Sequence, residues 1–265
     1  MRKMSSAVVA VAFVMQGSLA HADSLTPYFL FDGDSHIGYK IANGSVTPFE
    51  TFSRGYPVAI RDSIWLGDVD DKGAREFTLN GLSTGRAIAG DQSFSQLLDG
   101  TAGPSNNFGV ECCGATNSVT IANTDWSSQR VLFNIPFHGS GIAYDGLTGT
   151  LYVSEELLPT VRHYSLDGQL LDIFNLKQSL VGLAYEQASD SFWGFNRSTN
   201  NLVNFNRGGV VLQDIDIPGF TPSNPWAGEM PVAVSATPEP TSLMLLGTGV
   251  LLVARLRRHR ARCSA

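Results

Sequence analysis

Basic residues are scarce in the central part of this chain, which has 265 residues in all. Between Asp23 and Pro238 there are 11 lysine and arginine residues against 23 aspartate and glutamate residues, so this part carries a net charge of −12. The net charge of the whole chain is −6, because seven basic residues lie near its two ends. An acidic domain repels the phosphate backbones of DNA and RNA. We therefore expect no nucleic-acid partner.

Cysteine is also rare in this chain. It has three cysteines, and two of them, Cys112 and Cys113, are adjacent. Adjacent cysteines cannot link distant parts of a chain, which excludes a fold held together by disulfide bonds. In an oxidising compartment the pair could form a vicinal disulfide bond, and two buried thiols are the alternative.

No apolar run is long enough for a conventional transmembrane helix, which needs about 20 residues. The N-terminal run, Ala7–Met15, has nine residues and lies between two basic residues and the segment Ala20-His21-Ala22. A charged start, a short apolar helix and small residues before the cut are typical of a secretory signal peptide. We therefore predict a signal peptide over residues 1–22 and a mature domain over residues 23–236.

A second short apolar run lies near the C-terminus, after Pro238, Glu239 and Pro240. As a helix it would be roughly 20 Å long, against about 30 Å for the hydrocarbon core of a bilayer. Five arginines follow the run and should stay on the cytoplasmic side. Residues 242–256 are therefore expected to anchor the chain in the inner membrane only transiently. The arginines are Arg255, Arg257, Arg258, Arg260 and Arg262.

This order of Pro-Glu-Pro, short apolar helix and arginine cluster closely resembles the PEP-CTERM sorting signal, here over residues 237–265. The resemblance implies a bacterial protein that is exported through the Sec translocon and cut near Pro-Glu-Pro by an exosortase. The protein would then reside in the cell envelope, at the cell surface or outside the cell. The family is commonly linked to biofilm and extracellular polysaccharide, which makes polysaccharide or a surface protein a candidate partner.

The mature domain contains an internal repeat of 41 residues. Residues 141–144 return as 182–185, and residues 151–152 return as the aromatic pair 192–193. A period in the 40s with several short apolar runs in each unit is typical of a β-propeller blade. We therefore predict an all-β fold of about five four-stranded blades, with six blades or a β-sandwich as alternatives.

The strands of the fourth unit can be placed individually from turn signals such as Asp167-Gly168. A diverged third unit is expected over residues 100–137. The alternating apolar residues of Trp226–Val234 could pair with the N-terminal strands and close the ring. The predicted strands of the fourth unit are residues 141–144, 150–154, 160–165 and 169–176.

Residues 141–154 also resemble the blade opening of NHL-type and gluconolactonase-like propellers. This resemblance implies the fold and not an activity, because such blades occur in proteins of unrelated function. In propellers the turns between the second and third strands lie on the same side of the ring as the links between blades. We therefore expect a ligand face made of Asp68, Asp70, His138, Glu155, Glu156, Asn196 and Arg197.

Two functions from different classes fit these features. The first is a non-enzymatic binding module without catalytic residues or a cofactor. The alternative is a metal-dependent, lactonase-like hydrolase, with Asp68, Glu155 and Asn196 as candidate metal ligands. Residues 68–73 begin like a calcium loop, but Lys72 stands where a ligand belongs and Leu79 stands where the closing glutamate should be. Ca²⁺ is the candidate ion for this alternative, although the sequence does not identify the metal.

Overall fold

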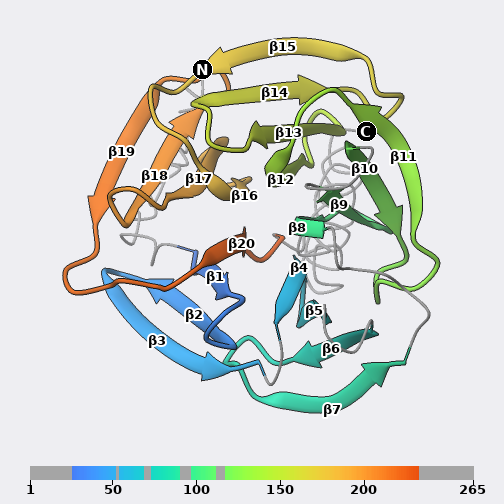
Figure 1. The fold of residues 1–265 in the computed structure, drawn as a ribbon, viewed down its shortest axis with the longest axis vertical. Helices are drawn as coiled ribbons and strands as arrows, with labels where there is room; N and C mark the ends of the chain where they lie inside the picture. The colour runs from blue at the N-terminus through green and yellow to red at the C-terminus, as the bar shows by residue number, and fades with distance from the viewer. Residues whose placement is uncertain (1–25, 52–53, 69–72, 90–96, 112–116, 233–265) are drawn as a thin grey trace, which may run out of the picture.

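The structure is a computed structural model that describes residues 26–51, 54–68, 73–89, 97–111 and 117–232. The regular structure of these residues consists of antiparallel β-strands, which form five four-stranded sheets. The sheets surround a common axis, with one strand of each sheet nearest the centre (Figure 1). The chain is therefore a five-bladed β-propeller, which confirms the predicted fold class and decides between five blades and six.

Four of the blades are continuous in sequence, and each runs from the axis outwards. Blade 2 consists of β4 (Gly55–Ile60), β5 (Ile64–Asp68), β6 (Gly73–Phe77) and β7 (Ser83–Ile88). Blade 3 consists of β8 (Leu97–Ala102), β9 (Asn107–Glu111), β10 (Asn117–Ala122) and β11 (Arg130–Ile135). Blade 4 consists of β12 (Gly139–Asp145), β13 (Thr150–Glu155), β14 (Thr160–Tyr164) and β15 (Leu170–Asn175). Blade 5 consists of β16 (Val181–Glu186), β17 (Ser191–Asn196), β18 (Asn201–Asn206) and β19 (Val211–Asp216).

Blade 1 is built from two distant parts of the chain. Its inner strand is β20 (Pro225–Glu229), which pairs with β1 (Tyr28–Asp32), while β2 (Ile37–Ala42) and β3 (Ser45–Glu50) lie outside them. In this pairing Leu30 lies opposite Gly228. This pairing confirms that the predicted segment closes the ring with the N-terminal strands, but the strand is Pro225–Glu229 and ends before Met230, where the expected apolar alternation begins. Because the sheet needs both segments, it joins the beginning and the end of the propeller.

The expected strands of blade 4 agree with β12 to β15 to within a few residues. The outer strand of blade 2, β7, has the sequence STGRAI, which contains one large apolar residue, and its side chains are mostly exposed. An exposed outer strand needs no apolar alternation, so it carries little signal. The diverged third unit begins at Leu97, three residues before the expected start.

The hydrophobic core is divided into five clusters, one at each contact between neighbouring blades. Between blades 4 and 5, for example, the ring of Tyr152 on β13 lies 4.1 Å from the ring of Phe192 on β17. These two residues belong to the apolar positions that recur after 41 residues, Tyr152 with Trp193 and Leu151 with Phe192. The repeat therefore exists because each blade must present the same apolar surfaces to its two neighbours.

Recurring glycines allow neighbouring blades to pack closely at the perimeter of the ring as well. Gly168, in the turn between β14 and β15, has a φ of +80°, and a Cβ there would lie 2.8 Å from Phe133 of blade 3. Gly209 occupies the matching turn of blade 5, where a Cβ would lie 2.8 Å from Phe174 of blade 4. The outer phenylalanine of one blade thus packs beneath the turn of the next, which leaves no room for a side chain.

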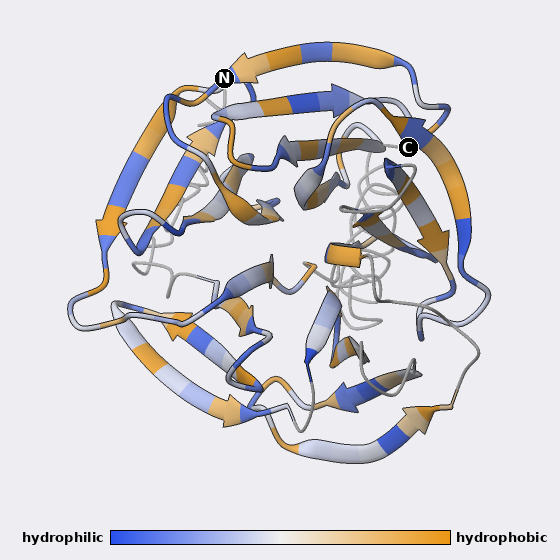
Figure 2. Ribbon diagram, in the orientation of Figure 1, coloured by the Kyte–Doolittle hydropathy of each residue, from blue (hydrophilic) through white to orange (hydrophobic). Residues whose placement is uncertain are grey.

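The perimeter also exposes apolar residues, which appear as orange segments on the outer strands β15 and β19 (Figure 2). They include Leu171 and Ile173 on β15 and Leu212 on β19, each about half exposed. No helix within the residues described is long and apolar enough to cross a membrane. The predicted signal helix, the sorting tail with its arginine cluster, Asp70 and the Cys112–Cys113 pair lie outside the described residues.

Candidate functional site

The two sides of the ring carry different connections. The turns between the first and second strands and between the third and fourth strands of each blade lie on one side, which we call the turn face. The links between blades lie on the other side, which we call the link face, together with the turns between second and third strands. Because β1 is a second strand and β20 is a first strand, the propeller's chain begins and ends on the turn face.

The inner strands of four blades meet on the carboxyl group of Asp99, a fully buried residue of β8. Its Oδ2 accepts hydrogen bonds from the backbone N–H of Ile142 at 2.8 Å and of Leu183 at 3.0 Å, and its Oδ1 accepts one from the N–H of Gly228 at 3.0 Å. These donors belong to blades 4, 5 and 1. Burial raises the pKa of Asp99 well above its usual range, against the lowering effect of the N–H donors. One side chain thus links four of the five blades.

Glycines allow the inner strands to approach this carboxyl group closely. At Gly182, which has a φ of +59°, a Cβ would lie 2.6 Å from the backbone nitrogen of Gly228. The hydroxyl of Tyr28 donates a hydrogen bond to the carbonyl oxygen of Gly182 at the same place. The positions of Gly100, Gly141 and Gly182 are 41 residues apart, so the recurring glycine of the repeat is an axial residue. The centre of the ring is therefore closely packed at this depth.

A cavity of about 450 Å³ opens on the turn face. All five blades contribute to its lining, through the inner strands and the turns that follow them. Its size lies within the range of small-molecule sites, which is about 300–1,000 Å³. The polar and aromatic residues that line it are Arg61, Asp62, Thr101, Tyr144, Tyr185, Gln187 and Glu229.

Glu229, which is 2% exposed, is the buried acidic residue of this cavity. Its Oε2 accepts a hydrogen bond from the N–H of Ala102 at 3.2 Å, and its Oε1 accepts one from the N–H of Met230 at 2.9 Å. Burial raises its pKa to about 8, although nearby Arg61 favours the ionised form. At neutral pH the carboxyl group is therefore mostly protonated, and a protonated carboxyl group can donate a hydrogen bond as well as accept one.

The guanidinium group of Arg61 is held by the turn of the next blade. It donates to the carbonyl oxygens of Gly103 at 2.7 Å and of Asn106 at 2.8 Å, and to Oδ1 of Asn107 at 2.8 Å. Burial lowers the pKa of Arg61, while Glu229 raises it. These bonds fix the side chain as a rigid part of the wall, so it offers the cavity a positive charge with few remaining N–H donors.

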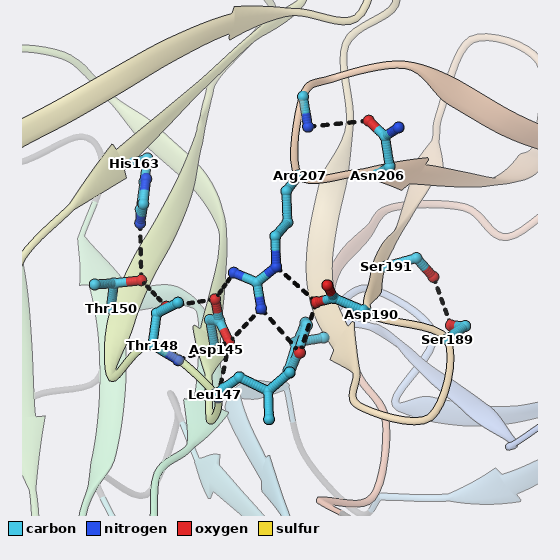
Figure 3. A network of polar contacts seen from close by, with 12 residues as sticks. Asp145, Leu147, Thr148, Thr150, His163, Ser189, Asp190, Ser191, Asn206 and Arg207 are labelled. Carbon is cyan, nitrogen blue, oxygen red and sulfur yellow. Dashed lines mark hydrogen bonds and ion pairs between the residues drawn. The ribbon is translucent and has the colours of Figure 1, made fainter.

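Arg207 orders the wall between blades 4 and 5 (Figure 3). It donates hydrogen bonds to both carboxylate oxygens of Asp145, to Oδ1 of Asp190 at 2.6 Å and to the hydroxyl of Tyr185 at 3.1 Å. Thr148 donates a further hydrogen bond to Asp145. Burial raises the pKa of Asp145, but the bonds from Arg207 and Thr148 outweigh burial and lower it. The ion pair thus joins two blades and positions the tyrosine that lines the cavity.

The residues expected to form a ligand face are distributed over the link face. The backbone N–H of Glu156 donates to the carbonyl oxygen of His138 at 2.7 Å, so these two segments are adjacent. The carboxylate of Glu155 accepts a hydrogen bond from Arg162 at 2.9 Å. Asp68 ends β5, and only its backbone is described. The structure therefore brings His138 and Glu156 together and pairs Glu155 with a cation.

Asn196 and Arg197 lie at the end of β17 and have different roles. Asn196 is buried; its amide donates to Gln178 at 2.9 Å, and its Oδ1 accepts from the N–H of Ser198 at 2.9 Å. Arg197 stacks on Trp226 and lines a second cavity, of about 340 Å³. Across the described ranges, no three His, Cys, Asp or Glu residues are grouped so that they could hold a metal ion.

Sequence reasoning did not identify Asp99, Glu229 or Arg207. Asp99 carries no repeat signal, because Ser140 and Val181 occupy the matching positions of the next two units. Glu229 follows Gly228 in the segment predicted to close the ring. The only sequence feature that could have indicated its role was that it is a single acidic residue next to an alternating apolar pattern. The roles of these residues depend on contacts between blades, which one sequence does not reveal.

Comparison with known proteins confirms the predicted sorting tail. Residues 236–258 match the PEP-CTERM protein-sorting motif. The motif indicates an exported protein that is processed by an exosortase, with transient anchoring in the membrane through its C-terminus. The match covers the tail and does not extend to the propeller.

The propeller is similar to solved structures in fold alone. A chain in the crystal structure of a nidogen/laminin complex aligns with a TM-score of 0.53 and 10% identity, over 77% of this chain and 84% of that chain. A protein of unknown function from Bacteroides caccae gives a TM-score of 0.45 and 16% identity, over 72% and 73% of the two chains. Virginiamycin B lyase from Staphylococcus aureus gives a TM-score of 0.44 and 15% identity, over 73% of this chain and 70% of that chain. No curated protein matches the sequence significantly.

Proposed function

We propose that the processed propeller is a non-enzymatic binding module of the bacterial cell surface or extracellular matrix, and that it binds carbohydrate in the turn-face cavity. The observation that carries this proposal is the cavity itself, about 450 Å³ in volume and lined by all five blades. The export signal supports the location, because a processed protein outside the inner membrane meets surface and matrix glycans.

The chemistry of the lining favours a sugar over a charged metabolite. Tyr144 supplies an aromatic ring, on which the apolar C–H face of a pyranose can stack, and the polar lining can bond its hydroxyl groups; Tyr185, which is 8% exposed, mainly forms part of the wall. Glu229 is mostly neutral at pH 7, because burial raises its pKa to about 8. The charge of Arg61 is opposed by exposed Asp62 in the same lining. A neutral oligosaccharide fits this combination.

Titration calorimetry of the secreted, processed protein tests the proposal, with maltotriose, cellotriose and chitotriose as neutral probes. The informative variant is Asp62→Ala/Gln187→Ala, because both residues line the cavity and both are exposed. We expect wild-type protein to bind at least one probe and this variant to bind it at least tenfold more weakly, since two hydrogen-bonding groups are lost.

A matched control is available in the same chain. Asp167→Ala/Gln169→Ala removes the same two residue types from an exposed turn between β14 and β15 that lines neither cavity. Its affinity should equal that of wild type. Absence of binding to all three neutral probes at millimolar concentration would contradict the proposal, and so would an equal loss of affinity in both variants.

The metal-dependent hydrolase is the alternative function, and its expected ligands are Asp68, Glu155 and Asn196. Titration with Ca²⁺ and Zn²⁺ separates it from the binding module. Heat and a thermal shift that disappear in Glu155→Gln would support the alternative. The present geometry supports it less, because Glu155 is paired with Arg162 and the amide oxygen of Asn196 already accepts a hydrogen bond.

A further inference from the structure

The second cavity lies on the link face, on the opposite side of the ring from the proposed carbohydrate site. Its volume is about 340 Å³. It is formed by the turn after β13, the link between blades 4 and 5, the turn after β17 and the segment that leads into β20. Three serines, an asparagine and two prolines contribute to its lining, together with Trp226 and Arg197.

Among the described residues that line this cavity, Arg197 is the charged one and none is acidic. This is unusual in a domain with 11 basic and 23 acidic residues. The nearby carboxylate of Asp32 does not line the cavity and is occupied by hydrogen bonds from the N–H and hydroxyl groups of Ser223, at 2.6 Å and 2.8 Å. The residues that line the cavity therefore carry one positive charge, which an anionic group of a ligand can neutralise, while the buried carboxylate of Asp32 lies outside the lining.

The guanidinium group of Arg197 is held in place before any ligand arrives. Its Cζ lies 3.9 Å from the centre of the Trp226 ring, and its Nη2 donates to Oδ1 of Asn224 at 2.8 Å. Among the described residues, no further hydrogen bond is made by its Nη1 and Nε groups, by the second N–H of Nη2, or by the hydroxyls of Ser179 and Ser198, so Nη2 and one neighbouring N–H can form a bidentate fork. Because this guanidinium group is planar and already held in place, it loses little conformational entropy when it binds a ligand.

We propose that the link-face cavity binds the carboxylate of an acidic sugar, with Arg197 as the bidentate donor and Ser179 and Ser198 as donors to the sugar. A carboxylate carries a single charge and matches the planar fork of arginine. A phosphate group carries a charge of about −1.5 to −2 at pH 7 and would need more than one cation. The proposal goes beyond the function proposed above, because it concerns another cavity, on the opposite face, and an acidic ligand.

Calorimetry with trigalacturonate and with neutral galactotriose tests this assignment on the secreted, processed protein. We expect wild type to bind trigalacturonate at least tenfold more tightly than galactotriose, with an affinity that falls as NaCl is raised. Arg197→Gln should weaken trigalacturonate binding at least tenfold. Arg197→Lys, which retains the charge but not the fork, should give an intermediate loss.

Arg86→Gln is the matched control. Arg86 also lies over a tryptophan, Trp65, at 5.3 Å, but it is paired with Glu76 at 3.1 Å, is 69% exposed and lines neither cavity. This variant should bind trigalacturonate like wild type, and so should Asp62→Ala/Gln187→Ala, which separates this proposal from the first. Thermal unfolding curves of all variants verify that each is folded.

Three results would overturn the proposal. The first is an unchanged affinity for trigalacturonate in folded Arg197→Gln or Arg197→Lys protein. The second is equal or tighter binding of galactotriose by wild type. The third is binding of inorganic phosphate or sulfate that is tighter than that of trigalacturonate, which would identify a general anion site.

Discussion

Two buried aspartates of this propeller, Asp99 and Asp145, illustrate how differently one residue type can be stabilised. Asp99 lies on the axis and is bonded by backbone N–H groups of three other blades. Asp145 lies between two blades further out and is bonded by the guanidinium group of Arg207. Burial raises the pKa of Asp99, whereas for Asp145 the bonds from Arg207 and Thr148 outweigh burial and lower the pKa.

The difference shows that burial does not by itself decide the charge of a carboxyl group. Backbone N–H groups donate hydrogen bonds but carry no net charge, so Asp99 keeps a raised pKa in spite of its donors. A nearby guanidinium group compensates the charge directly, and Asp145 is ionised at neutral pH. The axis is therefore held by hydrogen bonds that involve no cation, and the contact between blades 4 and 5 is held by an ion pair.

Removal of the axial carboxyl group should have the largest effect on stability. Asp99→Ala leaves the N–H groups of Ile142, Leu183 and Gly228 buried without their acceptor. Each lost acceptor costs about 1–3 kcal/mol, so we expect a loss of about 4 kcal/mol or more. Urea unfolding followed by tryptophan fluorescence measures it. A loss below about 1 kcal/mol would show that the axis does not depend on Asp99.

Removal of the cation beside Asp145 should have the next largest effect. Arg207→Gln leaves a buried carboxylate without its partner, and we expect a loss of about 3 kcal/mol, less than for a fully buried pair because the arginine is partly exposed. The same urea unfolding experiment applies. The double variant Arg207→Gln/Asp145→Asn should regain part of the loss, because it removes the uncompensated charge. If it regained nothing, the ion pair would not be the source of the effect.

The pH dependence of stability tests Glu229, which is buried like Asp99 and has no ion-pair partner at bonding distance among the described residues. Its folded pKa of about 8 lies above the ordinary value of 4.5, so its stabilising contribution is complete below pH 4.5 and is lost as the pH rises through 8. Between pH 5 and pH 9 the free energy of unfolding of wild type should fall by on the order of 4 kcal/mol relative to that of Glu229→Gln. If the free energy of unfolding changed with pH in the same way in both proteins, the raised pKa of Glu229 would be contradicted.

A pair of glycine variants tests a contact between blades that involves no charge. Gly168 and Gly44 both have positive φ values, +80° and +73°, but a Cβ at Gly168 would meet Phe133 at 2.8 Å, whereas a Cβ at Gly44 would meet no atom within 4 Å. Both alanine variants should lose about 1–2 kcal/mol because of backbone strain. Gly168→Ala should lose about 1 kcal/mol more, because the phenylalanine must move. Equal melting curves for the two alanine variants would show that the contact between Gly168 and Phe133 does not contribute to stability.

Much of the architecture could be predicted from sequence, because a blade is a local structure. Turn signals such as Asp167-Gly168 and the apolar pattern of residues 150–154 are contained within one unit, and the strands found there agree with the prediction. The outer strand β7 carries little such signal, because an exposed strand needs no apolar pattern. The candidate site was harder. Of the residues expected on the ligand face, Arg197 lines a cavity, while the larger cavity lies on the other face.

The sequence by itself determined the repeat, the blade as the repeating unit and the sorting signal, because each of these is encoded in residues that are neighbours along the chain. Only the tertiary structure decided which residues meet at the axis and line the two cavities. Asp99, Leu183 and Gly228 are far apart in the chain and come together when β20 closes the ring. Their contacts depend on how five blades pack, and no local pattern records that packing.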